Sequence, residues 1–240
     1  MFWKILAILS LAGVLAIGIW TVRSSTDKDS ERLEILKLSS KLDSLQSVLS
    51  KNEIFQAGLH HRIVKLELEL DMSNRTGKYL VIDRHEGHFW VRDGNAVLYD
   101  GVCGVGKGSR FVSGREYDFE TPSGKMKVLR KIKDPWWYRP NWFWYEKGMK
   151  VPKHFIQYPP NISFEGAISF YNSLSREDKL RVRAVPGSMG KYAIQIADGI
   201  YIHYNAHRRG RVSHGCIRVS RKDAEKLYHL LDVGDPVYVF

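Results

Sequence analysis

The segment SHGCIR at residues 213–218 brings together side chains and a backbone turn that suit acyl transfer. Its cysteine, Cys216, would attack a carbonyl as the thiolate, so it needs a nearby base or positive charge to ionise near neutral pH. His203, His214 and Arg218 offer both. The glycine before the cysteine permits a sharp turn, which lets backbone N–H groups point at the oxygen that becomes negative during attack. The parts of an acyl-transfer site therefore lie close together in the sequence.

This segment, with the Ile-His pair at 202–203, resembles the signature of the L,D-transpeptidases, the YkuD-type catalytic domain of bacterial cell-wall enzymes. The resemblance extends more weakly over residues 78–240, through the turn TPSG at 121–124, the glycine-containing stretch at 185–190 and the closing VGDPV at 233–237. One position departs from the pattern. The family usually has Gly or Ser after the first histidine, where this chain has Tyr204. A backbone role survives that change, but the ring would narrow the site.

The resemblance implies a mainly β catalytic domain, a YkuD-like β-sandwich with a short helix after the catalytic turn. It also implies that the substrate is the stem peptide of peptidoglycan. The donor would be cut between the diamino acid at stem position three and the terminal D-alanine, through a thioester at Cys216. An amine would then resolve the thioester, whereas water would make the enzyme an L,D-carboxypeptidase. A catalytically inactive, membrane-anchored scaffold is a third interpretation, to which only Tyr204 points.

The residues of the segment can be given roles in this chemistry. His203 takes the proton from Cys216, and the backbone carbonyl of Tyr204, or a neighbouring backbone oxygen, orients its imidazole in place of a carboxylate. Backbone N–H groups around Gly215 and Cys216, together with His214, stabilise the oxyanion.

Two further residues of the segment are expected to bind substrate, namely Ser213 and Arg218. The guanidinium fork of Arg218 fits a carboxylate, although a local salt bridge is the alternative. A zinc site is the rival interpretation of the histidines, because His203, His207, His214 and Cys216 carry N and S ligands. Their spacing matches no common zinc motif, and the loop around His207 is basic, so we expect no metal and no cofactor.

The overall composition limits the partners. The chain has 240 residues, which suggests one or two domains, and a net charge of +11. This charge indicates either a solvated basic surface or attraction to a polyanion, and we find no nucleic-acid-binding motif to support nucleic acid. The two cysteines do not make a disulfide framework, and Cys103 falls in an apolar run typical of a core.

Residues 2–22 are mostly apolar, and Lys4 is their only charged residue. Roughly 20 apolar residues suffice to cross a bilayer, so the length favours an uncleaved transmembrane anchor over residues 1–23. The alternative is a signal peptide cut near Ala16. The flanking charges do not settle the orientation. The expected chemistry places the catalytic domain in the periplasm or on the outer face of the cytoplasmic membrane.

Residues 28–72 carry apolar side chains at alternating spacings of three and four, which brings them to one seam of a helix. The seam consists of Ile35, Leu38, Leu42, Leu45, Leu49, the polar pair Asn52 and Gln56, and then Leu59, Ile63, Leu66 and Leu70. Such a repeat predicts a coiled-coil stalk and a homodimer. The alternative is a single amphipathic helix folded onto the domain. The stretch 72–77 reads as a linker.

The catalytic part, from residue 78 onward, shows a β pattern with two hairpin turns, at 93–95 and 198–199. The glycines at 104–108 are interpreted as a loop at a strand end. The aromatic-rich stretch 135–160 is either core or a wall of the substrate cleft. The stretch 161–183 looks like an insertion relative to the family pattern, either a lid or a surface excursion.

Overall fold

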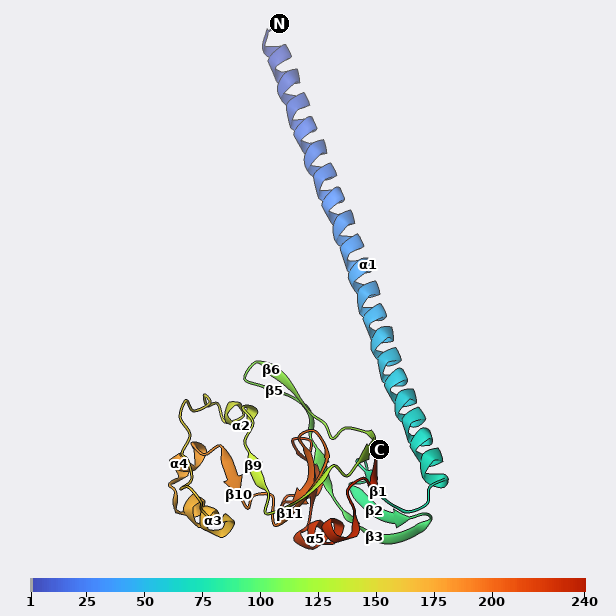
Figure 1. The fold of residues 1–240 in the computed structure, drawn as a ribbon. Helices are drawn as coiled ribbons and strands as arrows, with labels where there is room; N and C mark the ends of the chain where they lie inside the picture. Colours follow the sequence, from blue (N-terminus) through green and yellow to red (C-terminus); the bar gives the residue numbers. More distant parts are fainter. Residues whose placement is uncertain (1) are drawn as a thin grey trace. The chain divides into compact units, whose positions relative to one another are not determined.

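The computed structural model describes residues 2–240, except for the side chains of residues 2–29, 57, 60 and 61. The chain divides into two units, residues 1–60 and residues 61–240. The first helix, α1 (Phe2–Ser73), runs as one continuous element (Figure 1). No helix among the described residues is both long enough and apolar enough to span a bilayer. The anchor predicted at 1–23 falls on residues whose side chains lie outside this description.

The seam of the predicted coiled coil is open to solvent. Its nine apolar side chains, from Ile35 to Leu70, keep between 43 and 67 % of their surface exposed. Because helix α1 continues to Ser73, the predicted linker shortens to the residues that precede the first strand.

The last turns of α1 also bury a different stripe of side chains. Leu68 is 6 % exposed, and Val64 and Met72 lie beside it, at a spacing of four residues that aligns all three on one face of the helix. They pack in a small hydrophobic cluster with the aromatic and aliphatic side chains Tyr79, Val81, Trp90, Tyr238 and Phe240. The hydroxyl of Tyr238 donates a hydrogen bond to the Asp71 carboxylate. The end of α1 is therefore part of the core of the second unit.

Two larger sheets make up most of the second unit. The five-stranded sheet has the order β3-β2-β1-β15-β7, formed by β1 (Lys78–Asp83), β2 (His88–Asp93), β3 (Ala96–Val102), β7 (Gly124–Lys127) and β15 (Pro236–Val239). The six-stranded sheet has the order β13-β4-β14-β12-β11-β8, formed by β4 (Gly104–Gly106), β8 (Arg130–Lys133), β11 (Tyr192–Ala197), β12 (Ile200–Tyr204), β13 (Gly210–Ser213) and β14 (Ile217–Val219). Residues 104–106 therefore form an inner strand and not the predicted loop.

One hydrophobic core joins the two sheets. It contains Ile82 and Val91 from the five-stranded sheet and Ile202 and Ile217 from the six-stranded sheet, all at most 2 % exposed. Helix α5 (Arg221–Leu230) covers this core through Ala224 and Leu227 among others. The prediction of a mainly β domain with a short helix after the cysteine turn is confirmed.

Local sequence signals account for several of these elements. Strands β11 and β12 pair as an antiparallel hairpin around the predicted turn, where Gly199 has φ +68°. Helix α5 begins with a capping box in which Ser220 and Asp223 bond each other's backbone N–H groups.

The smaller elements lie between the strands of the six-stranded sheet in sequence. They are the hairpin of β5 (Gly108–Val112) and β6 (Arg115–Phe119), the pair β9 (Trp136–Tyr138) and β10 (Ala184–Pro186), and the helices α2 (Trp142–Tyr145), α3 (Phe164–Ser173) and α4 (Arg176–Leu180).

Candidate active site

Strands β12 and β14 place the predicted site residues side by side. The two strands are parallel neighbours, and His203 is directly opposite Arg218. Side chains alternate between the faces of a sheet, so Tyr201 shares the face of His203, and Cys216 shares that of Arg218. Ile202 and Ile217, which lie between these residues in the sequence, face the hydrophobic core. The alternation thus separates a polar site face from a buried apolar face.

A cavity of about 940 Å³ opens over this face. Five predicted site residues line it, namely His203, Ser213, His214, Cys216 and Arg218. Aromatic side chains form another part of the lining, namely Trp136, Trp137, Tyr138, Trp142 and Tyr201. Trp144, in contrast, is fully buried. The aromatic stretch therefore supplies both a wall of the cavity and part of a core.

His203 is held in one orientation by the backbone. Its side chain is buried, and Nδ1 lies 2.8 Å from the carbonyl oxygen of Tyr204. A carbonyl only accepts, so Nδ1 carries the proton and Nε2 is left with a free lone pair in the neutral ring. Burial lowers the pKa of His203 to about 4; the hydrogen bond to Tyr204 opposes this shift, and the charge of Arg218 adds to it. At neutral pH the imidazole is therefore a neutral proton acceptor.

The ring of Tyr204 lies away from the cavity. It packs against the main hydrophobic core, and the guanidinium carbon of Arg221 lies 4.1 Å from the ring centroid. A Cβ on Gly190 would come within 2.7 Å of the Tyr204 Cβ, so the Gly190 backbone packs closely against the Tyr204 side chain. The expected narrowing of the site by this ring does not occur, because the side chain is on the core side of its strand.

The Cys216 thiol faces an environment that favours its neutral form. Burial raises its pKa, and a backbone hydrogen bond from Tyr201 and the charge of Arg218 only partly oppose that shift. The sulfur lies 3.7 Å from the carbonyl oxygen of Gly199. We expected a thiolate near neutral pH, but these shifts favour a neutral thiol and a neutral imidazole in the same cavity. The physical reason is that, among the side chains that the structure describes, no carboxylate bonds to His203 to offset the cost of separating charge in a buried site.

Gly215 and Ser213 shape the turn before the cysteine. Gly215 has φ +109°, a conformation that other residues rarely adopt. Ser213 is 1 % exposed, and its hydroxyl donates to the carbonyl of Cys216 at 2.5 Å and accepts from the N–H of Gly215 at 3.2 Å. The Ser213 hydroxyl is therefore occupied by the turn itself.

His214 belongs to a polar cluster that the sequence did not reveal. Its Nε2 lies 2.8 and 2.9 Å from the two carboxylate oxygens of Glu146 and 2.8 Å from the Lys107 ammonium. Lys107 also pairs with Glu146 at 2.6 Å. The indole of Trp142 stacks on the imidazole with a centroid separation of 3.8 Å, and the ring of Phe119 lies nearly perpendicular to the imidazole with a centroid separation of 4.5 Å. The ring is thus fixed on several sides.

Electrostatics keep this cluster in a defined charge state. Burial lowers the pKa of His214, and Glu146 opposes that shift, so the ring is neutral at neutral pH. Burial alone would raise the pKa of Glu146, but the hydrogen bonds from Lys107 and His214 outweigh it and lower the value. Lys107 and Glu146 therefore form a charged pair beside a neutral imidazole.

Arg218 reaches the cavity from β14. It is half-buried, and its Nε is a buried donor with no hydrogen-bond partner among the described residues. One terminal nitrogen donates to the His207 carbonyl at a long 3.5 Å. No carboxylate within salt-bridge distance is found for it in the described part of the chain, so its donors remain available to a ligand.

Two other expectations concern the surroundings of the site. Within the side chains that are described, no group of three or more His, Cys, Asp or Glu residues is placed to hold a metal ion. The stretch 161–183 contributes no residue to the described lining of the cavity. It is tied instead to buried Arg139, which donates to the carbonyls of Lys179 and Val182 and to the hydroxyl of Tyr171.

Comparison with known proteins places the chain in one family. A family model described as YkuD, the L,D-transpeptidase catalytic domain, matches residues 77–239. The probable L,D-transpeptidase 3 of Mycobacterium tuberculosis is 46% identical over 54 residues, which are 20% of this chain and 20% of that protein. The chain thus matches about a fifth of the length of this curated relative.

Solved structures to which this chain is similar include L,D-transpeptidases. The enzyme from Mycobacterium smegmatis is 20% identical with a TM-score of 0.43, over 68% of this chain and 58% of that one. L,D-transpeptidase 3 from Mycobacterium tuberculosis is 22% identical with a TM-score of 0.41, over 68% and 61% of the two chains. The family model covers more than half of the chain, and the chain therefore belongs to the YkuD family of L,D-transpeptidase catalytic domains.

Proposed function

We propose that this protein is an L,D-transpeptidase that forms a thioester between Cys216 and the stem peptide of peptidoglycan. The observation that carries the proposal is that Cys216, His203 and Arg218 line one cavity, with His203 held as a neutral base. Family membership supports the reaction class. The whole protein's activity and substrate are inferred from these two facts together.

Acylation starts from the neutral thiol and imidazole. Nε2 of His203 takes the proton of Cys216 as the sulfur attacks the peptide carbonyl that precedes the terminal D-alanine. The C–S bond forms, and the carbonyl electrons move to the oxygen. When the oxyanion collapses, the C–N bond breaks and the imidazolium returns its proton to the departing amine. The products are a thioester at Cys216 and free D-alanine.

The oxyanion requires donors that are still available. The N–H of Gly215 already donates to Ser213, so we assign oxyanion stabilisation to the N–H of Cys216. The ring of His214 contacts Glu146 and Lys107, and we assign it to holding the turn. Ser213 takes the same role, since its hydroxyl is buried and occupied. Arg218 remains as the residue that binds a substrate carboxylate.

We propose that the remainder of the chain determines where the catalytic domain lies in the cell envelope. Stem peptides lie outside the cytoplasm, so we place the catalytic domain, residues 78–240, on the outer face of the cytoplasmic membrane, anchored through residues 1–23. Residues 28–72 form the stalk. The exposed seam along α1 supports pairing with a second copy of the chain, because burying both seams would remove large apolar side chains from water.

Product analysis tests the reaction. The protein is incubated with a stem tetrapeptide, with and without a diamino-acid amine acceptor, and the products are separated and weighed. A transpeptidase releases D-alanine and joins the tripeptide to the acceptor. A carboxypeptidase releases D-alanine and free tripeptide even when the acceptor is present. An unchanged tetrapeptide in both reactions, from folded protein, would support the inactive scaffold.

A further inference from the structure

The loop between β6 and β7 touches the turn that carries Cys216. Thr121 in this loop is fully buried. Its hydroxyl accepts a hydrogen bond from the N–H of Gly106 at 2.8 Å and donates one to the carbonyl of Gly215 at 2.8 Å. One hydroxyl thus bridges an inner strand of the six-stranded sheet and the residue before the nucleophile. Both bonds are buried, so neither is exchanged for a bond to water.

The backbones around this bridge are in direct contact. A Cβ placed on Gly106 would come within 2.1 Å of the Phe119 carbonyl and 2.4 Å of the Thr121 nitrogen. A Cβ on Gly215 would come within 2.9 Å of the Ile200 side chain. Gly106 therefore allows the loop and strand β4 to approach closely, while Gly215 leaves room for the Ile200 side chain of β12 beside the turn.

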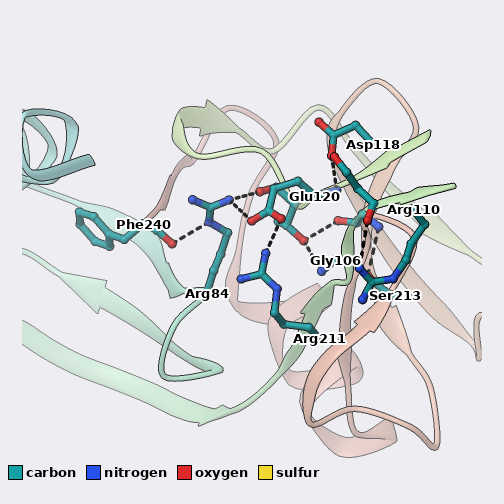
Figure 2. Close-up of polar contacts among 11 residues, drawn as sticks. Arg84, Gly106, Arg110, Asp118, Glu120, Arg211, Ser213 and Phe240 are labelled. Atoms are coloured by element: carbon teal, nitrogen blue, oxygen red, sulfur yellow. Dashed lines mark hydrogen bonds and ion pairs between the residues drawn. The ribbon is translucent and has the colours of Figure 1, made fainter. Parts of the chain in front are cut away.

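An ionic cluster holds the neighbouring residue, Glu120 (Figure 2). Arg84 donates to one carboxylate oxygen at 2.8 Å and Arg211 donates to the other. The same Arg84 nitrogen donates to the carbonyl of Thr121 at 2.5 Å. The Glu120–Thr121 pair is thus bound from two sides.

Arg84 is itself fixed to the end of β15. Its Nε donates to the Phe240 carbonyl at 2.8 Å, and its backbone N–H donates to the same oxygen at 3.1 Å (Figure 2). Arg84 directly follows β1 of the five-stranded sheet, whereas Arg211 lies on β13 of the six-stranded sheet. The cluster therefore joins the two sheets next to the turn.

We propose that Thr121 is a positioning residue for Cys216, and that Glu120, held by Arg84 and Arg211, fixes Thr121 in place. The proposal rests on the proposed role of Cys216 as the nucleophile. Neither Thr121 nor Glu120 lines the cavity, so neither contacts the substrate. They act through the Gly215 carbonyl, which lies in the same planar peptide unit as the Cys216 N–H, so its position sets the direction of that N–H and the position of the Cys216 Cα that carries the sulfur.

The first test compares Thr121→Val, which keeps the shape and removes the hydroxyl, with Thr121→Ser, which keeps the hydroxyl. Rates of Cys216 acylation by a stem tetrapeptide are measured by intact mass, on full-length protein that melts cooperatively. We expect Thr121→Val to lower the maximal acylation rate by about tenfold to a hundredfold, because small misplacement of reacting groups has such effects. The half-saturating peptide concentration should change little, and Thr121→Ser should restore most of the rate.

The second test addresses the ionic cluster with a milder change. Arg211→Met removes one contact to Glu120, and Arg209→Met is its matched control, because Arg209 is exposed and has no hydrogen bond or ion pair in the described part of the chain. We expect Arg211→Met to slow acylation by about two- to fivefold, the range for a partly exposed ion pair. Arg209→Met should match the unmodified protein. This pair remains informative if Thr121→Val does not fold.

Hydrogen exchange distinguishes a failure of this positioning role from a failure of the proposed function. Amide exchange of the peptide covering 213–217 should be faster in Thr121→Val than in Thr121→Ser, whether or not any variant is acylated. Failure of the unmodified protein to be acylated would refute the function and leave the exchange comparison intact. Folded Thr121→Val with unchanged acylation and exchange would overturn the proposal, as would Thr121→Ser being equally slow. Arg211→Met indistinguishable from Arg209→Met would overturn the part assigned to Glu120.

Discussion

Nδ1 of His203 lies 2.8 Å from the backbone carbonyl oxygen of Tyr204, the residue that follows it in β12. A carbonyl holds the ring and fixes its tautomer, but it carries no charge with which to stabilise an imidazolium. Burial therefore dominates and lowers the pKa of His203 to about 4. Any side chain after the histidine supplies the same carbonyl, so the tyrosine at this position is compatible with an active enzyme.

The role of His203 as the general base predicts a specific loss. His203→Gln retains a donor that can reach the Tyr204 carbonyl but has no basic nitrogen. We expect acylation of Cys216 to slow by about 10²–10⁴-fold, the usual contribution of a general base. Intact-mass time courses with a stem tetrapeptide measure this rate. A rate within a few-fold of the unmodified protein would assign the base elsewhere.

The same burial links stability to pH. The folded pKa of His203, about 4, is below the unfolded value of 6.5, so the unfolded chain binds more protons between these values. The stability that comes from keeping the ring neutral is present above pH 6.5 and is lost as the pH falls through 4. The full loss of folding free energy is about 3 kcal/mol, because a difference of one in pKa corresponds to about 1.36 kcal/mol. Chemical denaturation at pH 7 and pH 4 measures it, and His203→Gln should lose less stability over this interval.

The cluster around His214 predicts energetic coupling between two residues far apart in sequence. Glu146→Gln leaves Lys107 without its anionic partner, and Lys107→Met leaves Glu146 without its cation. Each single change should destabilise the turn and slow acylation, and the double change should cost less than the sum. Both side chains are partly exposed, so we expect a coupling free energy of about 1 kcal/mol. Denaturation of the four proteins in this cycle gives the value, and strict additivity would show that the pair is energetically independent.

The end of α1 predicts where the chain can be shortened. Leu68 is 6 % exposed and packs with Tyr79 and Tyr238, whereas Leu36, which is not a seam position, is 66 % exposed on the same helix. Leu68→Ala should lower the free energy of unfolding by about 2–5 kcal/mol, and Leu36→Ala should leave it nearly unchanged. Accordingly, residues 61–240 should fold alone, while a chain starting at residue 74 should be much less stable. Equal stability of the two leucine variants would show that the helix end does not belong to the core.

The exposed seam predicts the oligomeric state. Replacing Leu45 and Leu49 with glutamate puts charge at adjacent seam positions that are 58 and 60 % exposed in the single chain. Light scattering should detect a dimer for the unmodified protein and a monomer for this variant, because like charges would face each other across the seam. A monomer in both cases would contradict the paired stalk.

Local patterns allowed much of the site to be predicted from sequence. Alternation along β12 and β14 separates His203 and Cys216 from Ile202 and Ile217, and the hairpin and capping signals lie within a few residues of the elements that they define. The contacts of Glu146 with His214 and of Thr121 with Gly215 span 68 and 94 residues. No local pattern records them, because they exist only after the sheets have assembled.

The charge state of the cysteine could not be predicted from the sequence either. A cysteine among histidines and an arginine suggested a thiolate, but the pKa depends on burial, which only the packed structure reveals. Residues 104–106 were interpreted as a loop because of their glycines. They form an inner strand, where Gly106 allows the loop at Thr121 to approach closely.

The most direct measurement of the central claim is the mass of the protein after exposure to a stem tetrapeptide. Cys103 provides an internal control, because it is buried and its pKa is raised to about 12 by burial. We predict that the unmodified protein gains the mass of the tripeptide acyl group, that peptide mapping finds it on Cys216, and that Cys216→Ala gains nothing while melting normally. An equal gain of mass by Cys216→Ala, or an adduct on any other residue, would contradict the assignment of Cys216 as the nucleophile.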